Sequence, residues 1–316
     1  MGLFDINLYS NLQKDLWNQF VSNSKNGTFL FHRDFMEYHN DRFEDYSLMI
    51  YKKKKLIALL PANKVGKEIY SHQGLSYGGL LLNRDVKMND VVGIYDAMIT
   101  YLKNSNLKKI FFKIIPDIYC EYPSNELVYL LNKTGAELYR VDVEMVVDYS
   151  KPLTIHKTKL KRFNKSLEYG LKIKKTNDLS NFWNLVLEPK LMNKYDAKPV
   201  HSLSEIQSLK NLFPDNIYQY DVYFEDNIVA GITLFETENV IKSQYGAATE
   251  QGESLRALEY LFIHLIDRYK EKGKSFFSMG TVNGLNTLGY NEGLLKQKEE
   301  LGCSIFLQEF YFLELE

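Results

Sequence analysis

In residues 217–247 the chain reads IYQYDVYFEDNIVAGITLFETENVIKSQYGA. Two runs rich in β-branched and aromatic residues, 217–224 and 228–235, flank a polar turn, and a third such run follows at 240–247. Runs of this composition separated by short polar turns are typical of adjacent β-strands. The stretch therefore predicts a hairpin followed by a third strand.

An amphipathic helix is predicted directly after these strands, from about 254 to 269. Leu255, Leu258, Phe262 and Leu265 keep the spacing of a helix with one buried face. Ser254 is placed to cap the start of this helix, and a further strand is predicted at 274–279. The order is strand, strand, strand, helix, strand.

The same order occurs earlier in the chain. The first copy predicts strands at 47–51, 56–62, 69–72 and 109–114, with a helix at 90–102 before the last of them. Tyr46 corresponds to Tyr220 and Ser71 to Ser243, so the offset between the copies stays nearly constant. It is far longer than the period of about 20–50 residues that marks solenoid repeats. We therefore expect two homologous α+β domains, and a small ligand often binds between two domains.

Composition limits the protein class. The 316 residues, 45% hydrophobic, can bury two cores of ordinary domain size, for which we expect the ranges 1–150 and 151–316. The net charge of -1 gives no overall attraction to nucleic acid or anionic lipid. Cys120 and Cys303 are the only cysteines and have no metal-ligand spacing, which fits a reducing compartment and predicts no metal. No run of about 18 uncharged apolar residues occurs, so we expect a cytoplasmic protein without stable membrane insertion.

Four short segments suggest a family. They are SHQGLSYGG at 71–79, KPVHSL at 198–203, QYG at 244–246 and NEGLLKQKE at 291–299. Together with the duplicated strand and helix order, they resemble the FemAB-like branch of the GNAT acyltransferases over nearly the whole chain. The resemblance implies two GNAT-like domains, each a mixed, mostly antiparallel sheet flanked by helices. It is strongest to CoA-dependent N-acyltransferases of nucleotide-linked amino sugars, in which the first domain would face the acceptor and the second would hold acyl-CoA.

The resemblance also implies a donor site in the second copy. The thioester would lie along the strand at 240–247, and the phosphates of CoA would meet N–H groups at a helix start. The residues assigned to the donor are Gln244, Gly246, Ala247, Gly252, Ser254 and Leu255. Residues 251–257 do not match the usual GNAT pyrophosphate loop, and an ordinary helix cap accounts for the serine and the glycine equally well.

Three residues are candidates for the chemistry. The Tyr245 hydroxyl could donate to the oxyanion or protonate the leaving thiolate, although core packing explains this tyrosine equally well. His72 ends a strand and opens a Gly-rich turn, and His201 lies on a loop after Pro199. A histidine pKa suits proton transfer near neutral pH, but either residue could instead be structural. A chain of water molecules could also remove the proton of the amine, so no side-chain base is required.

Five residues are assigned to the acceptor. Gly74 and Tyr77 belong to the first copy, and Lys298 occupies a Gly-Leu-x-x-x-Lys pattern whose lysine, in the family it resembles, reaches the substrate. Asn291 and Lys194 complete the set. The lysine-rich segment 157–175 is either a contact for a diphosphate or a solvated helix between the domains.

Three functions remain open from the sequence. The first is transfer of an acetyl or hydroxybutyryl group from acyl-CoA to the amine of a dTDP-linked amino-deoxy sugar, for O-antigen or capsule synthesis. The second is tRNA-dependent aminoacyl transfer to a peptidoglycan precursor, which would favour an extended basic surface and a long helical hairpin that the sequence does not predict. The third is a nucleotide-sugar-binding module without catalysis. The sequence is compatible with a monomer or a homodimer.

Overall fold

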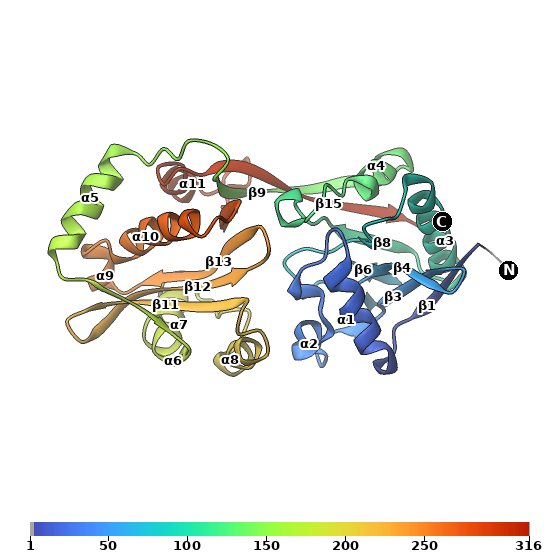
Figure 1. Cartoon of the computed structure of the whole chain (residues 1–316), viewed down its shortest axis with the longest axis horizontal. Coiled ribbons are helices and arrows are strands. Elements are labelled where there is room, and N and C mark those ends of the chain that lie inside the picture. Colours follow the sequence, from blue (N-terminus) through green and yellow to red (C-terminus); the bar gives the residue numbers. More distant parts are fainter. Residues whose placement is uncertain (1–2, 316) are drawn as a thin grey trace. The chain divides into compact units, whose positions relative to one another are not determined.

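The computed structural model describes residues 3–315, which form two compact units (Figure 1). Unit 1 ends at Asp142 and also contains the C-terminal segment that begins at Leu307, and unit 2 is Val143–Phe306. The last segment belongs to unit 1 because strand β15 (Ser304–Glu314) pairs antiparallel with β8 (Lys109–Lys113). The domain ranges expected from the sequence, 1–150 and 151–316, assign this C-terminal segment to the second domain instead.

Unit 2 contains the predicted hairpin and third strand as an antiparallel sheet. The sheet order in this unit is β10-β11-β12-β13-β14-β9. The strands are β10 (Lys172–Thr176), β11 (Ile217–Phe224), β12 (Asn227–Glu236), β13 (Val240–Ala248), β14 (Phe276–Thr281) and β9 (Glu137–Asp148), the last of which begins in unit 1. The α+β class and the mostly antiparallel sheets predicted from the sequence are confirmed.

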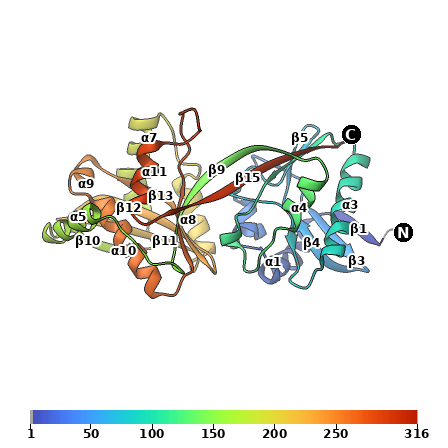
Figure 2. The ribbon, with the colours of Figure 1, turned by 90° about the horizontal axis from the view of Figure 1, so that it is seen from above.

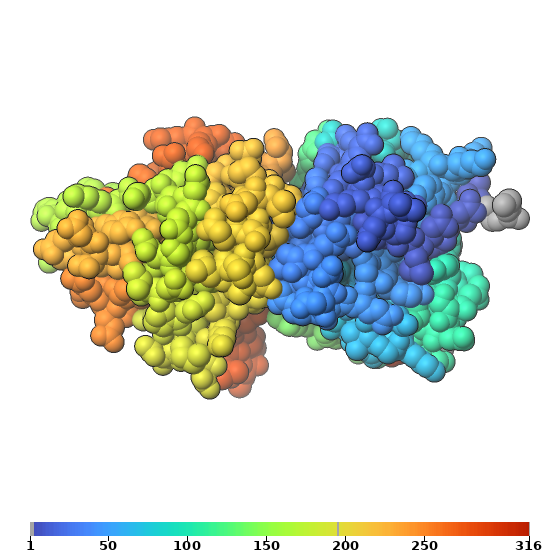
Figure 3. Space-filling view, turned by 90° about the horizontal axis from the view of Figure 1, so that it is seen from below, coloured from blue at the N-terminus to red at the C-terminus, as the bar shows by residue number. Residues whose placement is uncertain are grey.

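Helices cover both faces of this sheet. On one face α10 (Ala257–Glu271) packs against β12 and β13, with α5 (Lys157–Glu168) beside it. The opposite face carries α6 (Ser180–Phe182), the π-helical turn Trp183–Leu187, α7 (Glu188–Tyr195) and α8 (Leu203–Leu212) (Figures 1 and 3). The core between α10 and the sheet contains Ile232, Leu261, Leu265 and Phe277, all fully buried. Two short helices, α9 (Glu250–Ser254) and α11 (Glu292–Glu299), complete the unit.

The pairing of β13 with β14 is short. The two strands run parallel only where Val240–Lys242 meets Phe276–Ser278. Beyond Lys242, β13 continues against β12, and the register shifts beside Gln244, between the partners of Thr233 and Leu234. An extra residue of this kind bends the strand and increases its twist. The sheet therefore opens beside the second half of β13.

Unit 1 repeats the parallel crossover. Its hairpin is β3 (Leu48–Lys52) and β4 (Lys55–Leu60), and β6 (Glu68–Tyr70) is joined through α3 (Met88–Asn104) to β8, with which it pairs in parallel. The helix α4 (Glu126–Lys133) lies beside α3 (Figures 1 and 2). In contrast to unit 2, the hairpin forms a separate sheet of order β1-β3-β4-β7 with β1 (Phe4–Leu8) and β7 (Leu81–Leu82). The remaining strands are β2 (Glu44–Asp45) and β5 (Asn63–Val65).

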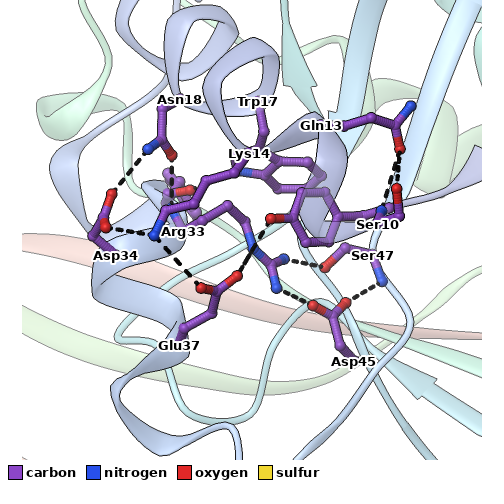
Figure 4. Close-up of polar contacts among 12 residues, drawn as sticks. Ser10, Gln13, Lys14, Trp17, Asn18, Arg33, Asp34, Glu37, Asp45 and Ser47 are labelled. Carbon is purple, nitrogen blue, oxygen red and sulfur yellow. Dashed lines mark hydrogen bonds and ion pairs between the residues drawn. The ribbon is translucent and has the colours of Figure 1, made fainter.

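A buried arginine joins the N-terminal helices of unit 1 to its hairpin (Figure 4). Arg33 begins α2 (Arg33–Met36), is 4% exposed, and lies 3.8 Å from the centroid of the Tyr9 ring. Its guanidinium donates to Glu37 Oε1 at 3.0 Å, to Ser47 Oγ at 3.2 Å and to the Asp45 carboxylate.

A second cation extends this network along α1 (Lys14–Asn23). The Lys14 ammonium lies 2.6 Å from Asp34 and 3.8 Å from Glu37 (Figure 4). Asn18 accepts from the Arg33 backbone N–H at 2.8 Å and donates to Asp34 at 2.9 Å. The packing of Tyr9, α1 and α2 against the hairpin therefore depends strongly on one buried charge.

Replacing Arg33 with methionine should lower the free energy of unfolding by about 3–5 kcal/mol, because Glu37 and Asp45 would keep their charges without the cation between them. Urea denaturation followed by circular dichroism measures this loss. The matched control is Arg42→Met at a side chain that is 38% exposed, where the change should stay within about 1 kcal/mol. A similar stability for the two variants would contradict the role of Arg33.

Candidate functional site

A cavity of about 580 Å³ lies in unit 2, beside the part of β13 that has separated from β14. Its wall includes Gly246 and Ala247 of β13, Gly252 of α9 and Lys194 of α7, four residues that the sequence analysis assigned to ligands. Its volume is within the range of about 300–1,000 Å³ found for small-molecule sites. We refer to it as the unit 2 cavity.

The helix predicted at about 254 to 269 is α10, which begins later, at Ala257, and is preceded by the short helix α9. Arg256 adopts a left-handed conformation, with φ of 58°, and separates α9 from α10. Thr249, not Ser254, caps α9, because its Oγ1 accepts from the Gly252 N–H at 3.0 Å. The Leu255 N–H donates to the Gln251 carbonyl at 3.0 Å. The N–H groups of Gly252 and Leu255 are thus used inside the turn, and Ser254 and Leu255 do not line the cavity among its described residues.

The helix start that faces the cavity is that of α10. Arg256, Leu258 and Glu259 line the cavity. The N–H groups in the first turn of any α-helix have no carbonyl partner within the helix, and the helix dipole makes this end positive. The Arg256 N–H donates to the Glu253 carbonyl, so a phosphate site is better placed at the N–H groups of residues 257–259 than at the residues predicted for it.

Basic side chains outnumber acidic ones around the cavity. Its described wall contains five lysine or arginine residues and three glutamates. Lys190 pairs with Glu253 at 2.5 Å, and Lys159 pairs with Glu259 at 2.5 Å and Glu300 at 3.4 Å. The other basic residues of the wall are Lys194, Arg256 and Lys296. The excess of positive charge suits an anionic ligand.

Of these basic side chains, Lys194 alone was among the residues predicted to bind a ligand. Lys190 was missed, although it lies one helical turn before the predicted Lys194 and after Pro189, a spacing that could have placed the two on one helix face. Lys159 belongs to the lysine-rich segment 157–175, which forms helix α5 and then enters strand β10. This lysine is 4% exposed and paired, so it is not part of a solvated helix face. No sequence pattern marked Lys296 or Arg256 as a ligand-binding residue.

Tyr245 and His201, both predicted for catalysis, contact each other. The Tyr245 hydroxyl lies 2.6 Å from His201 Nδ1 and accepts from the His201 backbone N–H at 3.3 Å. Since it accepts from the backbone, the hydroxyl can direct its own proton to Nδ1. Burial raises the pKa of Tyr245 to about 12, against the opposing hydrogen bond from His201, so this phenol is neutral at pH 7. The Trp183 ring packs edge-on against Tyr245 at 5.0 Å between centroids.

Neither side chain of this pair lines the unit 2 cavity among its described residues, although the next residue, Gly246, does. The β13 backbone is thus the covalent link between this pair and the cavity wall. Gln244 also lies outside the described wall, at the bulge of β13.

Lys298 and Asn291 have structural contacts within unit 2. The buried Lys298 ammonium donates to the carbonyl oxygens of Met279 at 2.6 Å, Gly280 at 3.1 Å and Thr281 at 3.0 Å. Burial lowers the pKa of Lys298 to about 8. The Asn291 side chain accepts from the Leu294 N–H at 2.9 Å and caps α11. The two residues thereby fix the end of β14 and the start of α11.

The residues predicted in unit 1 have different surroundings. The Tyr77 hydroxyl donates to Thr28 Oγ1 at 3.2 Å in the core, and a Cβ on Gly74 would lie 2.0 Å from His39 Nε2. His72, 4% exposed, lines a smaller cavity of unit 1. Burial, followed by the nearby His39, lowers the pKa of His72 to about 3, so its ring is neutral at pH 7.

A buried polar row crosses the unit 2 sheet and reaches Tyr245. Gln219 Nε2 donates to Asp221 Oδ1 at 2.6 Å, and Thr233 Oγ1 donates to Gln219 Oε1 at 2.6 Å. Thr233 is directly opposite Tyr245 in the pairing of β12 with β13. Asp221 is 1% exposed, and burial raises its pKa to about 6.

None of the described helices is long and apolar enough to cross a membrane. Within the described chain, no group of three or more His, Cys, Asp or Glu side chains is arranged to hold a metal ion.

Solved structures with the same architecture cover almost the entire chain. FemX matches 98% of this chain and 96% of its own with a TM-score of 0.70 and 10% identity. A tandem GNAT protein from the clavulanic acid biosynthesis pathway matches 99% of both chains, with a TM-score of 0.53 and 7% identity. The fold is FemAB-like, of the GNAT type. L-PGS from Bacillus licheniformis matches 85% of this chain and 83% of its own, with a TM-score of 0.56 and 16% identity. No family model and no curated protein matches the sequence.

Replacing Asp221 with asparagine should raise the free energy of unfolding at pH 7 by about 1–3 kcal/mol. The folded-state pKa of about 6 lies above the ordinary aspartate value of 3.8, so ionisation favours the unfolded chain. The cost is absent below the unfolded-state pKa and grows as pH rises toward the folded-state pKa. Urea denaturation at pH 4 and pH 7 should show a much larger advantage of the variant at pH 7 than at pH 4.

The control is Asp226→Asn in the exposed hairpin turn, which should behave as the wild type at both pH values. An Asp221→Asn protein that is less stable than the wild type at pH 7 would contradict the assigned cost of this carboxylate.

Proposed function

We propose that the protein is an acyltransferase whose acyl donor, acyl-CoA, binds in the unit 2 cavity. The observation that carries the proposal is the meeting of three features at one place: the free side of β13, the start of α10 and an excess of basic side chains. The phosphates would lie near Arg256, Lys194 and Lys296, where N–H groups and cations favour anions. The acyl end would lie along Gly246 and Ala247.

The reaction is attack of a neutral amine on the thioester carbonyl. A C–N bond forms, the C–S bond breaks, the amine loses a proton and the thiolate leaves. A backbone N–H of Gly246 or Ala247 would donate to the oxyanion that forms, a contribution that is among the largest in acyl transfer. A phenol whose pKa is about 12 is a poor acid toward a thiolate. We therefore assign Tyr245 and His201 the role of positioning the bulged segment of β13.

The acceptor we propose is the amine of a dTDP-linked amino-deoxy sugar, used in O-antigen or capsule synthesis. Its support is the resemblance of the segments at 71–79, 198–203, 244–246 and 291–299 to acyltransferases of surface-polysaccharide synthesis. A side-chain base is not required in this scheme, because the amine can lose its proton to water.

The alternative is tRNA-dependent aminoacyl transfer to a peptidoglycan precursor, which the overall similarity to FemX makes the second candidate. The described helices include no long hairpin arm; the longest, α3 and α10, have 17 and 15 residues. This alternative predicts that no thiol is released from acyl-CoA. A binding module without catalysis predicts the same result.

The proposed function predicts that acetyl-CoA or hydroxybutyryl-CoA releases free thiol when mixed with the protein and a dTDP-linked amino sugar. Tyr245→Phe should lower kcat by more than about tenfold, because the strand segment loses its link to His201, and should change KM for acyl-CoA by less than about threefold. A thiol reagent measures the rate continuously.

Tyr223→Phe is the matched control, since this tyrosine lies on β11 and contacts Asn181 through its hydroxyl. It should retain the wild-type rate. Absence of thiol release with every dTDP-linked amino sugar would reject this acceptor class, and an unchanged Tyr245→Phe rate would reject only the positioning role.

A further inference from the structure

Unit 1 contains a cavity of its own, of about 190 Å³, beside the end of β6. The unit 2 cavity lies beside the continuation of β13, which occupies the same place in the repeat as β6. Both strands pair in parallel with the strand that follows their helix. The unit 1 cavity is smaller than the roughly 300 Å³ of an ordinary small-molecule site, so it suits one ring of a larger ligand.

Aromatic rings form much of the wall. Tyr70 and Phe111 stack at 4.7 Å with 4° between their planes, and Tyr139 meets Phe111 edge-on at 5.8 Å. Tyr139 is 47% exposed, and Phe310 completes this part of the wall. Flat rings of this kind bind planar ligands by stacking, with little dependence on the exact heterocycle.

The charged groups of the wall are both cationic. Arg140 Nε donates to Asp142 at 2.7 Å, and its guanidinium lies 4.5 Å from the centroid of the Phe310 ring. The Lys113 ammonium donates to the Leu75 carbonyl at 2.7 Å. No Asp or Glu belongs to the described wall. A ligand with a phosphate therefore fits this cavity better than a cation does.

His72 contributes a buried polar atom to the wall. Its Nδ1 has no hydrogen-bond partner among the described residues, and its backbone is left-handed, with φ of 65°. The preceding Ser71 holds this conformation, since its N–H donates to the Phe111 carbonyl at 2.8 Å and its Oγ accepts from the Lys113 N–H at 2.9 Å. A buried nitrogen without a partner, in a backbone conformation that is uncommon outside glycine, indicates a ligand contact.

We propose that the unit 1 cavity binds a nucleotide, with the base against Tyr139, a base edge on His72 Nδ1, and the phosphate toward Lys113 and Arg140. The use of this site to hold the nucleotide end of the acceptor rests on the proposed function, whereas the binding itself does not require acyl transfer.

Isothermal titration calorimetry with dTDP tests the proposal, with pyrophosphate as the probe that lacks a base. We expect dTDP to bind at least about tenfold more tightly than pyrophosphate. Tyr139→Ala should weaken dTDP binding by at least about fivefold through loss of stacking. His72→Asn should also weaken it, and asparagine tolerates a left-handed backbone, so the fold is retained.

Tyr129→Ala is the matched control, because this tyrosine of unit 1 is 54% exposed and lies outside the described wall of the cavity. It should bind dTDP as the wild type does. Equal affinities for dTDP and pyrophosphate, or wild-type affinity in both Tyr139→Ala and His72→Asn, would overturn the proposal.

A parallel titration with acetyl-CoA separates the two claims. Acetyl-CoA binding without dTDP binding would overturn the nucleotide site and leave the proposed donor site standing. Binding of dTDP that depends on Tyr139, without acetyl-CoA binding, would support the nucleotide site and count against the proposed donor.

Discussion

The functional features of unit 2 depend on a parallel strand pairing that stops early. Val240–Lys242 pairs with Phe276–Ser278, and beyond this point β13 has β12 alone as its registered neighbour in the described sheet. A backbone that leaves one partner must satisfy its N–H and C=O groups in another way. A ligand that lies along β13 can form these hydrogen bonds, and the unit 2 cavity lies beside this part of the strand.

The surrounding elements maintain the opening. Lys298 holds the end of β14 through three carbonyl oxygens, and the bulge beside Gln244 turns β13. The left-handed Arg256 ends α9 and starts α10, so that the positive end of a 15-residue helix faces the cavity. On the other face of the sheet, Tyr245 is held by His201 and Trp183. These contacts come from separate segments of the chain, and together they make the opening a fixed part of the unit.

The strands were predictable because composition and turn residues mark them locally, and the repeat made the assignment consistent; β11 begins and ends at the predicted residues. The break between α9 and α10 at Arg256 was not predictable, because neither Gly nor Pro marks it and an arginine rarely adopts positive φ. The contact between Tyr245 and His201 depends on tertiary packing across the loop before α8, which no local pattern encodes. Gly74 and His72 both lie against His39, but His72 alone lines the unit 1 cavity, a difference that likewise depends on tertiary packing.

Amide hydrogen exchange with and without acetyl-CoA tests the central claim most directly. If the donor lies along β13 and its phosphates meet the start of α10, exchange should slow in residues 244–259 of unit 2 and stay unchanged around the unit 1 cavity. Unchanged exchange in residues 244–259 at saturating acetyl-CoA, or protection confined to unit 1, would contradict the account.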